Sequence, residues 1–389
     1  MKRDVIIVGG GPGGLMAAAC LAKDGFDVAV LEEHLEVGAP VHCTGVLACD
    51  AFGEFGLPGD ARLNEVRTAT FVSPSRLTVQ YTTRRVEAVV IDRLVFDRSL
   101  ALRAVAAGAS LVSGARVIDV APDADGVTVR LDRGHDQRAR AVVLACGANY
   151  GLQRRLGMGM PGAHLQSAQA ELPCTRPGHV QVHFGSQIAP GGFAWAVPVH
   201  RPGGWYARIG VMASREASAF FEAMVERTRE AWGIDRMTPA PRRRMLPLAP
   251  INRTYGRRVV AIGDAAGLVK ATTGGGIYYS LLSARVASEV LAAALARDRL
   301  EAVHLAPYER AWKARCADEF AAQLQLREAA ERMSDADIDD LFTLAQADGV
   351  MPIIRRTARF NRHREVAIAL LSHPPSRQIF FRRLAGMMS

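Results

Sequence analysis

Four stretches of the chain are almost entirely apolar and end at a glycine or a charged residue. A short run of this kind is typical of a strand that is buried on both faces of a sheet. The pattern predicts buried strands at Asp4–Val8, Val28–Leu31, Ala141–Gly147 and Arg258–Asp264.

Other stretches alternate apolar and polar positions, which is the pattern of a strand with only one face on a core. Alternation occurs at Leu77–Tyr81, Ser110–Val120 and Gly126–Leu131. It recurs between residues 160 and 245, where Pro-Gly-Gly turns separate the strands, and we expect an antiparallel sheet there. Helical patterns run from Gly13 to about Asp24, from Asp92 to about Ala107, and from Leu300 to the end.

The first buried strand is followed by a glycine-rich turn. Gly9, Gly11 and Gly14 have the G-x-G-x-x-G spacing, and Gly13 begins the helix. Glycines at this spacing allow a tight turn, close approach of the backbone to a pyrophosphate, and close packing of the helix on the strand. The N–H groups and the dipole of the helix N-terminus favour the phosphate charge. Glu32 ends the second strand, where its carboxylate is placed to accept hydrogen bonds from a ribose.

A second glycine-rich segment follows the last buried strand. It reads Gly263-Asp264-Ala265-Ala266-Gly267 and continues to Thr273-Gly274-Gly275-Gly276-Ile277. The first segment alone is a weak signal for a dinucleotide site. The two segments, so far apart in sequence, indicate one cofactor held at both ends, and we expect that cofactor to be FAD.

These elements predict an α/β fold with a discontinuous Rossmann-type FAD-binding domain, an antiparallel-sheet substrate domain and a C-terminal helical region. The expected FAD-binding domain starts with residues 1–160, which include an insertion into the substrate sheet near 62–90. We expect residues 161–245 to form the substrate sheet, 246–300 to return to the FAD-binding domain, and 301–389 to form the helical region.

Composition narrows the class of protein. Apolar residues make up 49% of the 389, which is enough to bury a full core in more than one domain. We expect no membrane-spanning helix, because Arg285 and Glu289 interrupt the longest apolar helix. The six cysteines contain no C-x-x-C pair, so we expect neither a metal site nor a disulfide framework, and a cytoplasmic location.

The positive charge is concentrated at the C-terminus. Residues 355–389 contain eight arginines and one acid, Glu365, and so carry +7 of the net charge of +9. No recognition motif or aromatic stacking platform accompanies this charge, so we expect no nucleic-acid binding. Arginines at 355–364, followed by apolar residues at 366–371 and 379–384, predict peripheral contact with the inner face of an anionic membrane. The alternative is that these apolar residues cap the protein's own cavity.

Four segments together resemble the geranylgeranyl reductase family of flavoproteins, which shares the fold of p-hydroxybenzoate hydroxylase. They are the first glycine motif with Glu32, the loop Pro40–Gly45, the segment Gly192–Pro198, and the second glycine motif through Ile277. The resemblance covers nearly the whole chain. It implies an FAD-dependent oxidoreductase that reduces C=C bonds of an isoprenoid, a prenylated lipid or quinone, or a polyene by hydride transfer from reduced flavin.

The resemblance also implies roles for individual residues in the first two thirds of the chain. It places Cys43 and Thr44 beside the flavin, gives Arg93 a contact with FAD, and puts the backbone of Val117 against the adenine. Trp195 is expected to line the cavity for an apolar isoprenoid-like substrate.

In the second glycine motif, the resemblance places Gly263 and Asp264 by the ribityl and pyrophosphate part of FAD. Gly275, Gly276 and Ile277 stand at the start of the next helix. Backbone N–H groups there would stabilise negative charge on the reduced ring.

The roles of three residues stay open at this point. Cys43 could donate or relay the proton that completes reduction of a double bond, or it could only shape the flavin pocket. His42 beside it is a weaker candidate for the same role. Trp195 could be a wall of the substrate cavity or an ordinary core residue.

Departures from related branches bear on the electron donor and on alternative functions. Cys146 stands where monooxygenases have an aspartate linked to pyridine-nucleotide use, which argues against direct reduction by NAD(P)H. The electron donor is therefore left open between NAD(P)H and a ferredoxin-type protein. The alternative functions are an FAD-dependent monooxygenase and a flavin halogenase. Gly267, where monooxygenases have histidine, argues against the first, and the four lysines, none of them in a matching segment, argue against the second.

Overall fold

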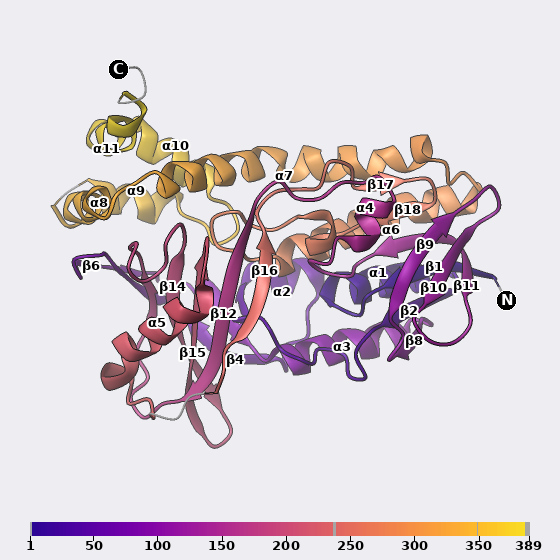
Figure 1. Ribbon diagram of the computed structural model, residues 1–389, viewed down its shortest axis with the longest axis horizontal. Helices are drawn as coiled ribbons and strands as arrows, with labels where there is room; N and C mark the ends of the chain where they lie inside the picture. The colour runs from indigo at the N-terminus through magenta and orange to yellow at the C-terminus, as the bar shows by residue number, and fades with distance from the viewer. Residues whose placement is uncertain (1, 236–238, 348, 386–389) are drawn as a thin grey trace.

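The structure is a computed structural model that describes residues 2–235, 239–347 and 349–385. The described chain forms two large sheets and one small sheet, with helices on their outer sides (Figure 1). The expected α/β architecture, with an antiparallel-rich sheet and C-terminal helices, is confirmed.

The first large sheet has a parallel centre, as the buried apolar runs predict. β1 pairs in parallel with β2 and β11, and β2 and β11 pair in parallel with β8 and β18. β10 pairs antiparallel with β11, β9 pairs antiparallel with β10, and the short β17 pairs with β18. The bounds are β1 Lys2–Val8, β2 Val28–Glu32, β8 Ser110–Ser113, β9 Val117–Pro122, β10 Val127–Leu131, β11 Gln137–Leu144, β17 Tyr255–Gly256 and β18 Val259–Ala261.

Helices cover this sheet because their apolar faces need burial. α1 packs against both α3 and α6, and α6 packs against the long α7, which crosses the upper part of Figure 1. α6 is long and apolar enough to span a membrane by length and composition, but 56% of its apolar window is buried in the protein, as in a core helix. The bounds are α1 Pro12–Lys23, α3 Arg93–Ala106, α6 Ile277–Ala296 and α7 Ala302–Glu331.

The second large sheet has the strand order β16-β12-β15-β14-β13-β5-β6. All neighbours are antiparallel except β13 and β5, which pair in parallel and bring residues 69–72 beside residues 180–183. The bounds are β5 Thr68–Val72, β6 Thr78–Thr82, β12 His164–Pro173, β13 Val180–His183, β14 Phe193–Arg201, β15 Gly204–Ala213 and β16 Arg242–Pro247.

A three-stranded sheet links the two halves, in the order β3-β7-β4. Helices α2, α4 and α5 and one 3-10 helix complete the described fold outside the C-terminal region. The bounds are β3 Val46–Ala48, β4 Arg62–Val66, β7 Ala88–Ile91, α2 Asp50–Phe55, α4 Gly151–Arg155, α5 Ala217–Trp232 and the 3-10 helix η1 Gly263–Ala266.

Two details differ from the sequence-based expectation. The stretch predicted as one strand over Ser110–Val120 is two strands in different parts of the sheet, because the chain turns at Gly114, which has φ +71°. The region 160–245 also contains α5, which the strand pattern did not predict. Its buried residues Phe221, Met224, Val225 and Trp232 recur at helical spacing and pack on the second sheet.

The C-terminal region is helical, as expected from the sequence. Asp335 and Asp339 of α8 accept hydrogen bonds from Ser186 and from Ser73 and Ser75, in two turns of the second sheet. These helices therefore brace the outer end of that sheet, at the upper left of Figure 1. The bounds are α8 Asp335–Ala347, α9 Val350–Thr357, α10 Arg364–Ser372 and α11 Pro374–Ala385.

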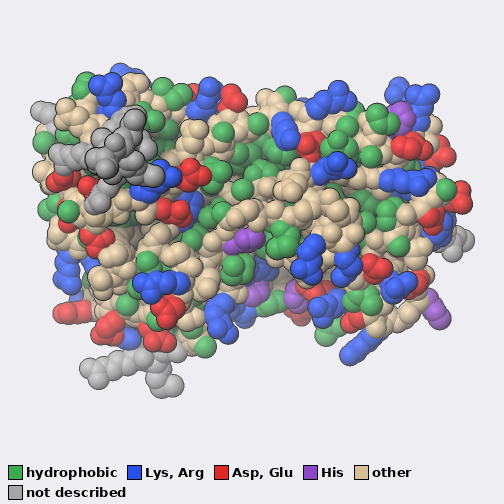
Figure 2. Space-filling view, turned by 45° about the horizontal axis from the view of Figure 1, so that its top comes forward, with side chains coloured by type: hydrophobic (Ala, Val, Ile, Leu, Met, Phe, Trp, Pro, Cys, Tyr) green, Lys and Arg blue, Asp and Glu red, His purple; other side chains and the backbone are tan. Residues whose placement is uncertain are grey.

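Positive side chains are spread over the surface as well as concentrated at the C-terminus. Figure 2 shows Lys and Arg on both halves of the visible face, with Asp and Glu among them. Some of this charge is paired, as in the exposed Arg67–Glu65 and Arg98–Glu36 ion pairs. Pairs this exposed contribute little to stability.

Gly210 creates the space that the indole ring of Trp195 occupies. The two residues lie opposite each other on β15 and β14, and a Cβ atom at position 210 would overlap the indole. Gly210 lies on a buried strand, so the ring packs directly against its backbone.

Gly210→Val is expected to lower the free energy of unfolding by ~2 kcal/mol, because the new side chain must displace a packed indole. Urea unfolding followed by circular dichroism measures this. Gly53→Ala is the matched control: a Cβ at this exposed position of α2 meets nothing within 4 Å, so this variant should be as stable as the parent or slightly more stable. Equal stability of the two variants would contradict the packing role of Gly210.

Candidate functional site

A cavity of about 760 Å³ has lining residues from both large sheets. Its wall includes both glycine motifs, the loop of residues 38–46, and inward-facing residues of β13, β14 and β15. Ligand sites commonly occur where two layers of structure meet in this way.

The first glycine turn has little room for side chains. Gly9 has φ +108°, and a Cβ there would lie 2.5 Å from the carbonyl oxygen of Ala145. A Cβ at Gly14 would overlap the Gly9 carbonyl, so Gly14 packs the helix onto the strand and does not line the cavity. Gly11 differs, because a Cβ there would meet nothing in the protein within 4 Å and Gly11 faces the cavity. Its missing side chain leaves space for a ligand at the N-terminus of α1.

Glu32 is at the end of β2 on the cavity wall, where the expected ribose acceptor would be. Its Oε2 accepts a hydrogen bond from Gly10 N at 2.6 Å, and its Oε1 accepts from His34 N at 2.9 Å. Oε1 also contacts His34 Nδ1 at 2.6 Å, so Oε2 is the carboxylate oxygen with a lone pair left for a hydroxyl donor. Val117, at the start of β9, lines the same cavity.

The second glycine motif forms the other end of the cavity. Asp264 lies in η1, directly after β18, and burial raises the pKa of its carboxyl group, while Arg244 and Arg93 act in the opposite direction. A Cβ at Gly276 would overlap Asp264 Oδ1, so the missing side chain admits the carboxylate to the start of α6. Gly263 does not line the cavity, because it packs on Ser280 of α6.

Gly275, Gly276 and Ile277 line the cavity at the N-terminus of α6. The first backbone N–H groups of a helix have no partner within the helix. They and the helix dipole favour a negative group at this point.

The loop before β3 brings Cys43 to the cavity wall. Cys43 Sγ accepts a hydrogen bond from Gly45 N at 3.3 Å, and Thr44 Oγ1 donates to Gln169 Oε1 at 3.0 Å. Burial lowers the pKa of the neighbouring His42 to about 4, with Arg244 acting in the same direction. His42 is therefore a neutral imidazole at pH 7, and its buried Nδ1 has no hydrogen-bond partner among the described residues.

Arg93 stands beside Cys43 on the cavity wall. Its guanidinium pairs with Asp97 at 2.8 Å and also interacts with the Cys43 sulfur. Burial by itself would lower the pKa of Arg93, but Asp97 and Cys43 outweigh it and raise that pKa. Arg93 therefore remains a cation next to the thiol.

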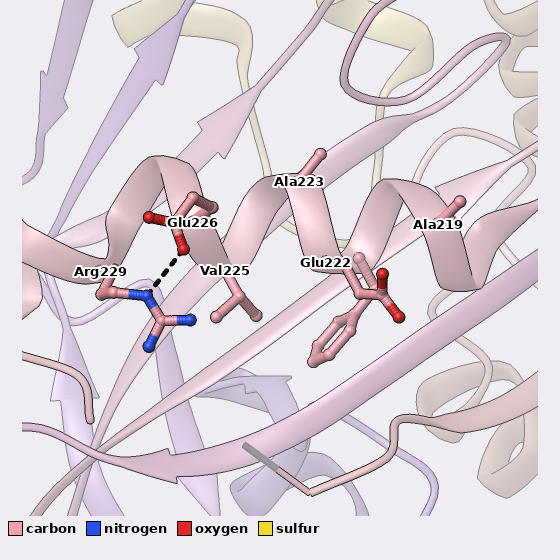
Figure 3. A pocket seen from close by; sticks show the side chains of 7 residues that line it. Ala219, Glu222, Ala223, Val225, Glu226 and Arg229 are labelled. Carbon is pink, nitrogen blue, oxygen red and sulfur yellow. Dashed lines mark hydrogen bonds and ion pairs between the residues drawn. The ribbon is translucent and has the colours of Figure 1, made fainter. Parts of the chain in front are cut away.

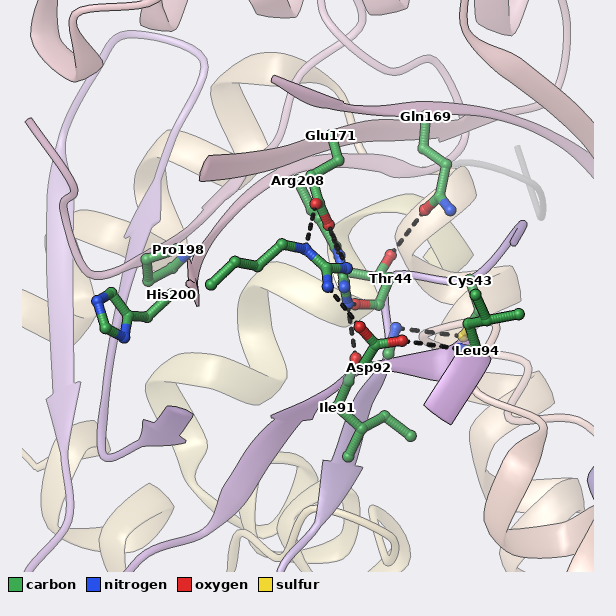
Figure 4. Close-up of polar contacts among 12 residues, drawn as sticks. Cys43, Thr44, Ile91, Asp92, Leu94, Gln169, Glu171, Pro198, His200 and Arg208 are labelled. Atoms are coloured by element: carbon green, nitrogen blue, oxygen red, sulfur yellow. Dashed lines mark hydrogen bonds and ion pairs between the residues drawn. The ribbon is translucent and has the colours of Figure 1, made fainter. Parts of the chain in front are cut away.

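The Cys43 loop is held from behind by a buried arginine. Arg208 of β15 is 4% exposed, and its guanidinium donates to the carbonyls of Thr44 at 2.6 Å and Ile91 at 3.0 Å. Its Nε pairs with Glu171 at 2.6 Å, and Figure 4 shows these side chains converging behind the loop.

Glu171 is shared by a second arginine. Arg201 pairs with it at 2.6 Å and also with Asp92, which caps α3 by accepting from the backbone N–H groups of Leu94 and Val95. Burial alone would raise the pKa of Glu171, but the two arginines lower it. The network therefore connects the second sheet to the start of α3 and to the Cys43 loop.

The wall beyond the Cys43 loop is apolar. Trp195 and Phe193 of β14 have ring centroids 5.7 Å apart, and both line the cavity. Trp195 is 9% exposed and belongs to a buried cluster, so it is both a core residue and a cavity wall. The other apolar lining residues of the second sheet are Val180, Val182, Val197, Met212 and Leu246.

Of the residues predicted from sequence, only Gly14 and Gly263 do not line the cavity. The sequence analysis missed Gln169, Lys270 and Phe360, which do line it. Lys270 lies within the second glycine-rich segment, between Asp264 and Gly276, and this position was the sequence signal that it could reach the cavity. Phe360 comes from the C-terminal region, and no local pattern indicated that it reaches the cavity.

A separate hollow of about 460 Å³ lies along the outer side of α5 (Figure 3). Its charged side chains are Glu222, Glu226 and Arg229, of which the last two pair with each other at 2.8 Å. None of the site residues predicted from the sequence lines it, so we assign it no role.

The residues of the large cavity fit FAD. Open space at Gly11, the acceptor Glu32, and the two N-termini of α1 and α6 match the pyrophosphate, ribose and ring of an extended dinucleotide. Among the described residues no group of three or more His, Cys, Asp or Glu is arranged to hold a metal ion.

Comparison with known proteins agrees with this geometry. The profile of a family described as FAD binding domain matches residues 2–318. The digeranylgeranylglycerophospholipid reductase of Methanocaldococcus jannaschii is 30% identical over 362 residues, which cover 89% of this chain and 90% of that protein. The digeranylgeranylglycerophospholipid reductase 1 of Methanopyrus kandleri is 30% identical over 372 residues, covering 88% and 93%.

Solved structures show the same fold. A geranylgeranyl bacteriochlorophyll reductase-like protein from Thermoplasma acidophilum superimposes with a TM-score of 0.84 at 22% identity, over 99% of both chains. The halogenase PltM, solved as an L111Y mutant with FAD, gives a TM-score of 0.70 at 16% identity, over 96% of this chain and 86% of that one.

Arg208→Lys is expected to loosen the Cys43 loop, because a lysine cannot donate to Glu171, Thr44 and Ile91 in the same fixed geometry. Alkylation of Cys43 by iodoacetamide, read by peptide mass spectrometry, should become several-fold faster. Arg201→Lys is the matched control, since Arg201 contacts Glu171 and Asp92 but not the loop. Equal labelling rates in both variants would contradict the role given to Arg208.

Proposed function

This chain belongs to the FAD-binding domain family and, within it, to the geranylgeranyl reductases, and we propose that it reduces C=C bonds of an isoprenoid lipid. The observation that carries the proposal is the continuity of the cavity. The same space that is bounded by both glycine motifs continues along the apolar wall of Trp195, Phe193 and Val182.

FAD supplies the hydride equivalent and stores the electrons when it is bound. The groups that would bind FAD are the α1 N-terminus at Gly11, Glu32, Arg93, Asp264 and the α6 N-terminus. The apolar wall then orients an isoprenoid chain, which offers no polar group for hydrogen bonding. Orientation is the main contribution that a protein makes to this chemistry.

Reduction of an isolated double bond also needs a proton. His42 is neutral at pH 7, because its pKa is lowered to about 4, so it cannot act as an imidazolium donor. Cys43 lies on the cavity wall beside the Arg93 guanidinium, and its S–H group is a proton source at this wall. We assign the proton to Cys43.

We also propose that a protein of the ferredoxin type, and not NAD(P)H, delivers the electrons. Cys146 lines the cavity at the position where monooxygenases have the aspartate that is linked to pyridine-nucleotide use. Burial raises the pKa of the Cys146 thiol to about 11. This thiol is uncharged at pH 7 and cannot replace a carboxylate.

The alternative functions find less support. A histidine at position 267, the residue expected in a monooxygenase, would be strained, because Gly267 has φ +69° and a Cβ would overlap the Ala249 carbonyl. The similarity to halogenase structures, at 16–17% sequence identity, shows a shared fold and does not indicate a shared activity. Lys270 lines the cavity, as a halogenase lysine would, but its ammonium donates a hydrogen bond to Phe360 O at 3.1 Å.

The FAD-loaded protein, reduced by dithionite without oxygen, should add two hydrogens to each reduced double bond of a polyprenyl glycerophospholipid. The mass of the product measures this addition. NADPH alone should reduce the flavin only slowly, as read by loss of flavin absorbance in stopped flow.

Cys43→Ser should keep FAD and lower turnover by ~100-fold, the size of a general-acid effect. Cys49→Ser is the control.

Two results would overturn this proposal. One is an unchanged lipid mass together with halide- or oxygen-dependent product formation in air. The other is fast turnover with NADPH as the only reductant, which would refute the protein electron donor.

We further propose that the enzyme reaches its lipid from the inner, cytoplasmic face of a membrane. Five exposed arginines, at 355, 356, 359, 362 and 364, lie beside Ile368 and Leu371, which are 53% and 40% exposed. Ala367 and Ile379 are instead buried among the helices, and the side chains of residues 380–384 lie outside the described part. Phe360, between the arginines, lines the cavity and connects this face to the site.

Vesicle flotation tests the membrane contact. The protein should float with anionic vesicles at low salt and leave them at high salt, because each arginine near the surface contributes ~1 kcal/mol. Ile368→Ser with Leu371→Ser should reduce flotation, while Leu102→Ser, on the exposed face of α3, should not. Flotation that is absent, or unchanged in the double variant, would contradict this contact.

A further inference from the structure

Lys270 is a buried lysine on the wall of the cavity. It is 4% exposed and lies in the segment between η1 and α6. A lysine is rarely buried to this extent unless it is paired or has a function. Its neighbours therefore decide what it does.

The side chain lies against the start of α6. If Gly275 carried a Cβ, that atom would be 2.6 Å from Lys270 Cε and 3.2 Å from Nζ. The missing side chain at Gly275 thus lets the ammonium approach the backbone at the point where α6 begins. The dipole of α6 and the lysine both place positive charge at this edge of the cavity.

The ammonium is bonded to neutral groups. Nζ donates to Phe360 O at 3.1 Å and Asn361 Oδ1 at 3.3 Å, and lies 4.3 Å from the centre of the Phe360 ring. Burial lowers the pKa of Lys270 to about 8, opposed by Glu319 and Asp50. At pH 7 Lys270 is therefore protonated in most molecules. Its direct hydrogen-bond partners are uncharged and do not neutralise the ammonium.

We propose that Lys270 raises the reduction potential of the bound flavin by stabilising the negative charge that its ring gains on reduction. The proposal rests on FAD binding, as given under the proposed function. Two electrons from the donor and one proton leave one negative charge on the ring. Lys270 keeps its own proton and forms no covalent bond, so it tunes the equilibrium and takes no part in proton transfer.

The size of the effect follows from Coulomb's law. Two unit charges ~6 Å apart at an effective dielectric constant of ~20 change an equilibrium constant by more than about tenfold. Removing the lysine charge should therefore move the potential by at least ~30 mV, the shift that corresponds to a tenfold change for a two-electron couple.

The alternative is that Lys270 only anchors the segment of Phe360 and Asn361 to the cavity wall. Besides Lys270, the segment of Phe360 and Asn361 is held by Tyr279, which donates to Asn361 O at 2.9 Å, and by the 2.7 Å contact between Thr272 and His363. If Lys270 only anchors this segment, loss of Asn361 should have the same effect as loss of the lysine.

The experiment is an anaerobic redox titration of the full-length FAD-loaded protein against a reference dye at pH 7, without lipid. Lys270→Met, which removes the charge, should favour the oxidised flavin by about tenfold or more. Lys270→Arg keeps the charge and Asn361→Ala removes only the anchor, so both should stay within about threefold of the parent. Lys270→Gln repeats the neutral case if the methionine variant is unstable.

Two results would overturn the proposal. Equal shifts in Lys270→Met and Asn361→Ala would assign Lys270 to anchoring, and the absence of a shift in both neutral variants would remove it from redox tuning. A parent protein that binds no FAD would instead refute the proposed function, so the two failures are distinguishable.

Discussion

The close packing of α1 against α6 is the contact on which the site depends. A Cβ at Gly13 would overlap Ser280 Oγ, so the two helices can approach only because position 13 carries no side chain. This approach brings the N-termini of both helices to one cavity, although they are far apart in sequence. Two positive helix ends facing one space explain why a long anionic dinucleotide fits there, with its phosphates at one end and its ring at the other.

The second sheet is fixed to this centre by a partly buried ion network, of which Arg208 is the most buried member. Arg208 and Arg201 share Glu171, and through Thr44 and Asp92 they hold the Cys43 loop and the start of α3. Removal of Glu171 would leave the buried guanidinium of Arg208 without its carboxylate partner, which is expensive. The apolar wall that carries Trp195 is thereby held at a constant position relative to Cys43, which a reaction between a flavin and an apolar chain requires.

Much of the fold and of the cofactor end of the site could be predicted from the sequence, because both depend on local patterns. Apolar runs identify β1, β2 and β11, and glycine spacing identifies the two turns. The missed features depend on contacts between distant segments. The parallel pair of β13 with β5 and the meeting of Lys270 with Phe360 have no local signature. Gln169 belongs to a strand that was predicted only as part of a sheet, so its contact with Thr44 was not foreseeable.

We propose that one continuous cavity holds FAD and an isoprenoid chain face to face. A crystal structure of the protein with FAD and a polyprenyl lipid is the decisive test. We expect the flavin ring between the Cys43 loop and the start of α6, with a lipid double bond against the ring on the side of Trp195. A lipid bound elsewhere on the protein, or a flavin ring outside this space, would refute this arrangement.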